Sequence, residues 1–231
     1  DEFNQLYYHH IFKKNQKEYL TEKQLPTGGA LLIDIDLRFE PTIKERQYNE
    51  NHIIDLIQLY LEELKKLVVF TNDEFNIIVF EKDDINQQDT VTKDGIHLLF
   101  GIQLEHSIQK LLRENIVKEI GEIWSDIPII NSWNSVFDEG ISAGYTNWQL
   151  FGSRKPGHMP YKLSKYYRCQ YLDDFELNQM NDYDMEVVFP QICARYSNNP
   201  KFEVQEHITI EPISKPKLKI KQVDNTEPEN I

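Results

Sequence analysis

The chain has 231 residues, a formal net charge of −13 at pH 7 and a hydrophobic content of 40%. This length predicts one large domain or two small ones, and the acidic charge argues against a protein whose whole surface binds nucleic acid. No apolar stretch approaches the roughly 18 residues that a membrane-spanning helix needs, so we expect no membrane partner.

The apolar pattern predicts strands and helices that mix without a strict strand–helix–strand repeat. Residues 1–27 are polar and aromatic, and we expect mixed local structure there. The predicted strands are residues 29–38, 75–80, 96–100 and 146–151, and the predicted helices are residues 51–66 and 107–120. Asn49 or Asn51 could cap the first helix. We expect loops at residues 83–94 and around Pro156, Gly157 and Pro160, and the mixture favours an α+β fold.

Asp34 and Asp36 lie in the first predicted strand. The residues before them are apolar without alternation, which predicts a strand buried on both faces. At positions i and i+2 both carboxylates project from one face, roughly 6.6 Å apart along the strand. Two such carboxylates repel each other and lose hydration, and a divalent cation between them would remove both penalties. A solvated strand face or a salt bridge to Arg38 is the alternative.

Lys93, Gly95 and His97 form the next candidate group. Lys93 is expected in the turn before strand 96–100, and His97 inside that strand. Lys93 would supply a point charge for phosphate, and Gly95 would let a backbone N–H approach closely. His97 can donate a hydrogen bond to a phosphate oxygen, although a histidine packed into the core is the alternative.

Asp138 is ambiguous, because it follows the apolar pair Val136-Phe137 and could either cap a turn or bind a metal beside Asp34 and Asp36. Asp126 or Glu139 could take the metal-binding role instead.

Residues 151–168 form a local basic segment with five cations and no acid. The cations are Arg154, Lys155, Lys162, Lys165 and Arg168. Gly152-Ser153-Arg154-Lys155 offers a backbone N–H, a hydroxyl and two cations, which suits a triphosphate. Tyr161, Tyr166 and Tyr167 interleave with the later cations, and such rings can stack on the bases of a single strand. A solvated basic loop is the alternative.

Residues 211–231 are rich in Pro, Lys, Glu and Asn, which predicts a solvated linker or tail after a domain at residues 1–210. Cys169 and Cys193 are the only cysteines, too few for a disulfide framework or a zinc ribbon. We interpret them as reduced, buried thiols of an intracellular protein, and we expect no zinc site.

Taken in order, these motifs resemble those of the archaeo-eukaryotic primase superfamily, and most closely the primase domain of the primase–helicases of nucleocytoplasmic large DNA viruses. The matching segments are Leu32-Ile33-Asp34-Ile35-Asp36-Leu37, Lys93-Asp94-Gly95-Ile96-His97, Phe137-Asp138 and Phe151-Gly152-Ser153-Arg154-Lys155. The resemblance implies a catalytic sheet of the RNA-recognition-motif type with flanking helices. It further implies that the protein acts in a viral replication compartment in the host cytoplasm or nucleus, and that a helicase domain lies elsewhere in the full-length chain.

The resemblance also implies site roles. Asp34, Asp36 and Asp138 would be the catalytic ligands of two Mg²⁺ or Mn²⁺ ions, while Lys93 and His97 would hold the phosphates of a nucleoside triphosphate. The chain departs from the family at Gly95, where serine is common, so that a hydroxyl contact is lost. No Gly-rich phosphate loop of the Walker type is present in the sequence.

We therefore expect a DNA primase or primase-polymerase that makes primers for DNA replication on a single-stranded DNA template. The template would run along Lys162, Lys165, Arg168 and Tyr161, and the nucleotide would contact Lys93, Gly95, His97, Ser153, Arg154 and Lys155. A metal-dependent nuclease would leave Lys93 and residues 152–155 unexplained. A non-catalytic binding module would not need Asp34, Asp36 and His97 intact.

Overall fold

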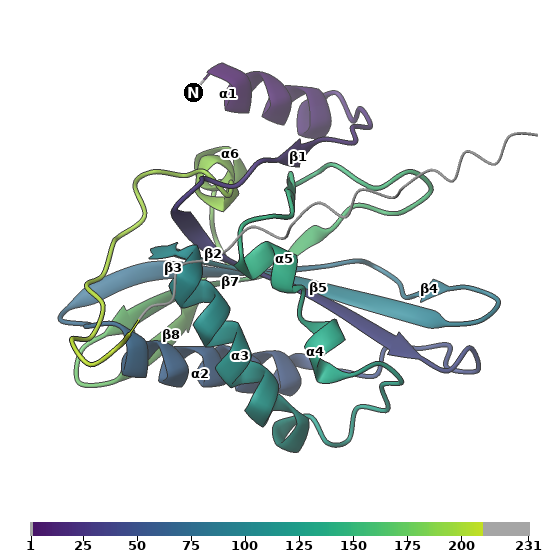
Figure 1. The fold of residues 1–231 in the computed structure, drawn as a ribbon. Helices are drawn as coiled ribbons and strands as arrows, with labels where there is room; N and C mark the ends of the chain where they lie inside the picture. The colour runs from purple at the N-terminus through teal and green to yellow at the C-terminus, as the bar shows by residue number, and fades with distance from the viewer. Residues whose placement is uncertain (1, 210–231) are drawn as a thin grey trace, which may run out of the picture.

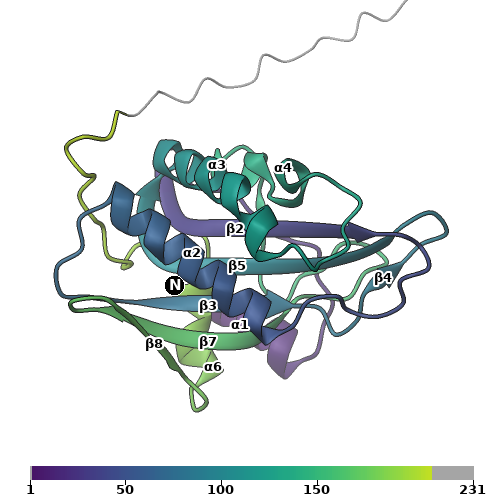
Figure 2. The same cartoon turned by 90° about the horizontal axis from the view of Figure 1, so that it is seen from below.

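The computed structural model describes residues 2–209, which are built around a six-stranded antiparallel sheet (Figure 1). Its strands are β2 (Gly28–Phe39), β3 (Asp73–Glu81), β4 (Asn86–Gln87), β5 (Thr92–Glu105), β7 (Lys162–Tyr171) and β8 (Phe175–Gln179). The order β2-β5-β3-β7-β8 can be followed across Figure 2, and β4 pairs with β5. A second, two-stranded sheet pairs β1 (Thr21–Glu22) with β6 (Trp148–Gln149).

Helices cover both faces of the large sheet (Figures 1 and 2). One face carries α2 (Glu50–Leu67) and α3 (His106–Ile123). The opposite face carries α1 (Glu2–Tyr8), the π-helix η1 (His9–Lys13), α6 (Met185–Val188) and the 3₁₀ helix η2 (Phe189–Ile192). Two short helices, α4 (Trp133–Val136) and α5 (Glu139–Ser142), contact β2. The predicted α+β fold is confirmed.

The two faces of β2 explain where the polar site begins. Leu31, Ile33, Ile35 and Leu37 point into the core beneath α2 and α3. On the other face Ala30 and Leu32 enter a second core, built with α1, η2 and the segment around Phe151. Along β2, the second core ends at Leu32. Asp34, Asp36 and Arg38 continue along the same face of the strand, and each is partly exposed. The expected burial on both faces therefore holds only for the first half of the strand.

The predicted helices and the first strand agree with the structure to within a few residues. Asn49 caps α2, since its side chain accepts hydrogen bonds from the backbone N–H groups of Asn51 and His52. The His52 ring in turn accepts from the Asn49 N–H, which completes a capping box. None of the helices in residues 2–209 is long and apolar enough to cross a membrane.

Two predictions of local structure were wrong. Residues 83–94 do not form a simple loop, because β4 and the start of β5 pair as a hairpin. Lys93 accordingly lies within β5 and not in a turn before it. The predicted strand 146–151 is reduced to Trp148–Gln149, since Gly152 turns the chain at a φ of 88° and buries Leu150 and Phe151 in the second core. The predicted tail at residues 211–231 lies outside the described residues.

Candidate active site

The register of β2 and β5 brings the first two motifs together. Asp34 lies opposite His97 and Asp36 lies opposite Gly95 in this antiparallel pair. The Nε2 atom of His97 is 3.4 Å from Oδ1 of Asp34. A register shifted by one residue would place the imidazole and the carboxylate on opposite faces of the sheet.

His97 is packed among aromatic rings, yet it also contacts the acid. Its ring stacks on Tyr161 with the centroids 3.7 Å apart and tilts against Trp148 at 4.5 Å. Burial alone would raise the pKa of Asp34, but His97 and then Lys155 and Lys82 outweigh it and hold this pKa below its usual range. Asp34 is therefore ionised near neutral pH.

Asp36 is engaged by the residue that follows it on the same strand face. Oδ2 of Asp36 accepts hydrogen bonds from Nε of Arg38 at 3.0 Å and from Nη2 at 2.8 Å. The salt bridge predicted as the alternative to a metal is therefore present. Both side chains are about two-fifths exposed, at 43% for Arg38 and 41% for Asp36, so the pair contributes little to stability.

Asp138 is held at the same end of β2. Its backbone N–H donates to the carbonyl of Asp34 at 3.0 Å, and an isolated β-bridge joins Phe137 to Ile35. Its Oδ1 accepts from the backbone N–H groups of Gly140 at 2.6 Å and Ile141 at 3.2 Å, which caps α5. The predicted cap is present, and Asp138 lines the same cavity as Asp34 and Asp36.

A buried arginine fixes the segment that leads into Asp138. Arg113 of α3 is 4% exposed, and its guanidinium donates to the carbonyl of Phe137 from Nε at 2.9 Å and from Nη2 at 2.7 Å. The same Nη2 donates to the carbonyl of Asn134 at 2.5 Å. Nothing in the sequence pattern singled out Arg113, because its partners are two backbone carbonyls and Oδ1 of Asn134, which lie 21 to 24 residues further along the chain.

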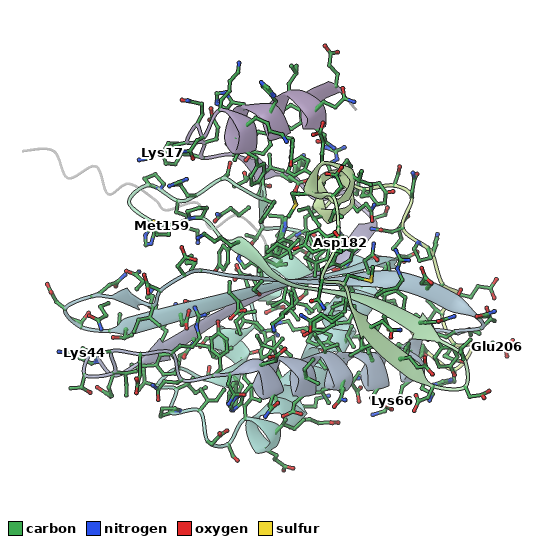
Figure 3. The ribbon with its side chains drawn as sticks, turned by 180° about the vertical axis from the view of Figure 1, so that it is seen from behind. Lys17, Lys44, Lys66, Met159, Asp182 and Glu206 are labelled. Carbon is green, nitrogen blue, oxygen red and sulfur yellow. The ribbon has the colours of Figure 1, made fainter. Side chains whose placement is uncertain are left out.

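The three acids open into one cavity of about 510 Å³. Its charged lining residues are Asp34, Asp36, Arg38, Lys82, Asp84, Lys93, Asp94, Asp138, Glu139 and Lys155. A smaller cavity of about 210 Å³ shares Asp34, Asp138 and Lys155 with it and adds His97 and Arg154. Met159 belongs to the loop that precedes β7. Figure 3 shows it on the same side of the large sheet as Lys17, which follows η1, so this loop lies on the sheet face that carries α1 and η1.

Three lysines face the acids in the larger cavity: Lys93 from β5, Lys155 from the loop before β7, and Lys82 directly after β3. Sequence reasoning missed Lys82. Phe80 pairs with His97, so strand alternation would have placed Lys82 on the same face. Burial, followed by repulsion from Lys155, lowers the pKa of Lys82. The cavity thus combines carboxylates with cations suited to phosphate.

A family model described as "C962R protein N-terminal AEP domain" matches residues 1–167, which is most of the chain. The chain belongs to the archaeo-eukaryotic primase family. The match includes every acid and lysine of the large cavity and ends within β7. It confirms the resemblance drawn from the motifs.

A curated protein of Acanthamoeba polyphaga mimivirus, named "Putative helicase L207/L206", is 32% identical to this chain over 140 residues. That alignment covers 59% of this chain and only 14% of the mimivirus protein. The primase-family domain therefore corresponds to a small part of a viral protein whose name refers to a helicase.

The family implies divalent metal ions, and the donor chemistry of the cavity fits them, because Mg²⁺ and Mn²⁺ prefer carboxylate oxygens. Within residues 2–209, however, no three His, Cys, Asp or Glu side chains converge closely enough to hold a metal. Two of the candidate donor atoms are also engaged, because Oδ2 of Asp36 accepts from Arg38 and Oδ1 of Asp138 caps α5. Of the alternative ligands, Glu139 lines the cavity, whereas Asp126 contacts His52 elsewhere.

We expect Arg38→Met to tighten Mn²⁺ binding by about two- to fivefold, because the metal would no longer compete with an exposed ion pair for Asp36. Isothermal titration with Mn²⁺ measures this affinity. Arg168→Met is the matched control, since Arg168 of β7 forms a similarly exposed pair with Glu74 of β3. Equal tightening in both variants would mean that only the net charge matters.

Residues 152–155, which the sequence predicts to bind a triphosphate, only partly line the two cavities. The Ser153 hydroxyl is buried and bonds the Tyr7 hydroxyl at 2.7 Å and the Leu20 N–H at 3.0 Å. Arg154 lines the smaller cavity, and its buried Nε has no hydrogen-bond partner among the described residues. Lys155 lines both cavities. Ser153 would reach a nucleotide only after leaving these two partners.

The cations proposed for the template have acidic partners that the sequence did not reveal. On β7, Lys162 pairs with Asp83, Lys165 with Glu50 at 2.6 Å, and Arg168 with Glu74 at 3.2 Å. Tyr166 and Tyr167 are 4% and 3% exposed, so the expectation that their rings stack on bases was wrong. They were misassigned because β7 alternates and turns these rings into the two cores.

Proposed function

We propose that this primase-family domain catalyses template-directed nucleotidyl transfer, as a DNA primase or primase-polymerase that makes primers for DNA replication. The observation that supports this most is the cavity in which Asp34, Asp36 and Asp138 face Lys82, Lys93 and Lys155. A site for nucleotidyl transfer needs carboxylates for metal and cations for a triphosphate within one pocket.

Asp34, Asp36 and Asp138 would hold the divalent ions. When bound, Mg²⁺ or Mn²⁺ lowers the pKa of an attacking 3′-hydroxyl and stabilises the charge on the leaving pyrophosphate. Lys82, Lys93 and Lys155 would neutralise the phosphates, with Arg154 contributing from the smaller cavity. His97 contacts Asp34 through Nε2 and lines the smaller cavity, and the same nitrogen would donate to a phosphate oxygen when a nucleotide is bound.

The template and the rest of the protein complete the proposal. Single-stranded DNA would approach along β7, where Lys162, Lys165 and Arg168 would exchange their acidic partners for phosphates. By analogy with the mimivirus protein, we propose that the full-length chain carries a helicase and acts in viral replication.

One assay tests this function against its two competitors. The protein is incubated with a single-stranded DNA template, Mn²⁺ or Mg²⁺, and labelled ribo- or deoxynucleotides. New polymer supports the primase or primase-polymerase. Shortened template would show a nuclease, and a mobility shift without any chemistry would show a binding module.

We expect Lys93→Ala to weaken triphosphate binding about ten- to a hundredfold, because a hydrogen bond to a charged group contributes on the order of 1.5–3 kcal/mol. Fluorescence anisotropy of a labelled nucleoside triphosphate measures the effect. Lys118→Ala is the control, since Lys118 is an exposed lysine of α3 on the opposite face of the sheet. Unchanged binding by Lys93→Ala would remove this lysine from the nucleotide site.

A further inference from the structure

Gly95 is tightly covered by the side chain of Tyr161. A Cβ atom built at position 95 would lie less than 3.0 Å from the Tyr161 hydroxyl oxygen, closer than real Cβ atoms come. The next nearest groups are the Ile35 carbonyl at 3.3 Å, which would have to shift by a few tenths of an ångström, and Cζ of Tyr161 at 3.5 Å, an ordinary van der Waals contact. The phenol hydroxyl is therefore the main obstacle to serine at this position, and the Ile35 carbonyl is a smaller one.

The backbone donor expected at Gly95 is already engaged. Its N–H donates to Oδ1 of Asp94 at 2.9 Å, and Asp94 is in turn held by Arg46, whose Nε donates to Oδ2 at 2.8 Å. Asp94 is 4% exposed, so this arrangement is shielded from water. A phosphate at this wall of the cavity would need another donor.

Tyr161 lines the same cavity as Gly95, Lys82 and Lys93. Its ring stacks on His97 at 3.7 Å, and Nζ of Lys82 lies 4.8 Å from the ring centroid. These contacts fix the ring and cover the face that we expected to stack on a template base. Burial, followed by Asp34 and Asp36, raises the pKa of Tyr161, so the hydroxyl keeps its proton as a donor.

We propose that the Tyr161 hydroxyl donates a hydrogen bond to a phosphate oxygen of the incoming nucleoside triphosphate, in the space that a serine at position 95 would fill. The inference rests on the proposed function and assigns Tyr161 to the nucleotide instead of the template. A neutral donor at this place binds phosphate without adding a further positive charge between Lys82 and Lys93.

Three variants test the proposal: Tyr161→Phe, Gly95→Ser, and the two combined. Binding of ATP and dATP in the presence of Mn²⁺ is measured by isothermal titration, with adenosine as the ligand without phosphate. Tyr161→Phe should lose about tenfold in triphosphate affinity, the low end expected for a hydrogen bond to a charged group, and nothing for adenosine. Tyr183→Phe, whose ring contacts Tyr166 outside the cavity, is the control.

The combined variant makes the test specific. Gly95→Ser alone should weaken binding, since its side chain collides with the phenol hydroxyl. In the Tyr161→Phe background the closest clash is gone and the serine restores a hydroxyl, so the double variant should bind more tightly than either single variant. Such non-additivity is the signature of two residues that share one space.

The outcomes separate the inference from the function on which it rests. If the wild-type protein binds neither triphosphate, the proposed nucleotide site fails. If the wild type binds and Tyr161→Phe binds equally well, the hydroxyl contact alone is overturned. Loss in Tyr161→Phe that Gly95→Ser does not relieve would also overturn it, because the hydroxyl would then not act at this position.

Discussion

Asp34→Asn should reduce nucleotide incorporation at least about a hundredfold while leaving the domain folded, comparable to the loss of one strong electrostatic contact to a transition state. The amide keeps the size of the carboxylate and can still meet Nε2 of His97 through its oxygen. It loses the negative charge that a divalent ion requires. Incorporation of labelled nucleotide on single-stranded DNA over a series of Mn²⁺ concentrations measures the effect.

Asp173→Asn is the control for this experiment, since Asp173 is an exposed acid in the turn between β7 and β8. Near-normal synthesis by Asp34→Asn would end the metal-dependent mechanism. Asp138→Asn extends the test, because asparagine caps a helix as well as aspartate does. If Asp138→Asn is active and Asp138→Ala is not, Asp138 serves as a cap and not as a ligand.

Arg113→Met should lower the free energy of unfolding by about 3 kcal/mol, because the carbonyls of Asn134 and Phe137 would lose buried hydrogen bonds to a charged group. For a domain of this size the corresponding drop in melting temperature is about 6–12 °C. Urea unfolding followed by circular dichroism measures the loss. Lys118→Met, an exposed position on the same helix, should stay within about 0.5 kcal/mol of the wild type.

Activity gives Arg113→Met a second readout. Phe137 precedes Asp138, so loosening this segment should also weaken synthesis at temperatures where the variant is still fully folded. A destabilised variant with normal synthesis would show that the α5 cap and the bond to the Asp34 carbonyl hold Asp138 without Arg113. A variant of unchanged stability would show that other donors or water satisfy the two carbonyls.

The sequence was most informative for β2, where apolar core residues and the candidate metal ligands lie on one strand. The apolar run before Asp34 predicted β2, and the order of the motifs predicted the family. Contacts between distant segments could not be predicted. Lys82 reaches the cavity through the pairing of β3 with β5, and Arg113 bonds Asn134 and the Phe137 carbonyl from a different helix.

The basic segment at residues 151–168 also shows that sequence alone does not reveal contacts with distant residues. Five cations without a nearby acid in the sequence suggested an open positive surface, yet Asp83, Glu50 and Glu74 arrive from other elements. The sequence predicts that the Tyr161 ring stacks on a base, whereas in the structure the ring stacks on His97 and its hydroxyl lies over Gly95. Local composition reports the charge that a segment carries, and the fold determines which charges remain unpaired.

The ion pairs along β7 have a thermodynamic consequence for a bound template. A free lysine that meets a DNA phosphate releases a condensed counterion, which drives binding and makes it sensitive to salt. Here Asp83, Glu50 and Glu74 would be freed at the same time and would attract small cations from solution. Ion uptake by the protein would then partly balance ion release from the DNA. Template binding along this strand would accordingly depend less steeply on ionic strength than binding by unpaired lysines and arginines.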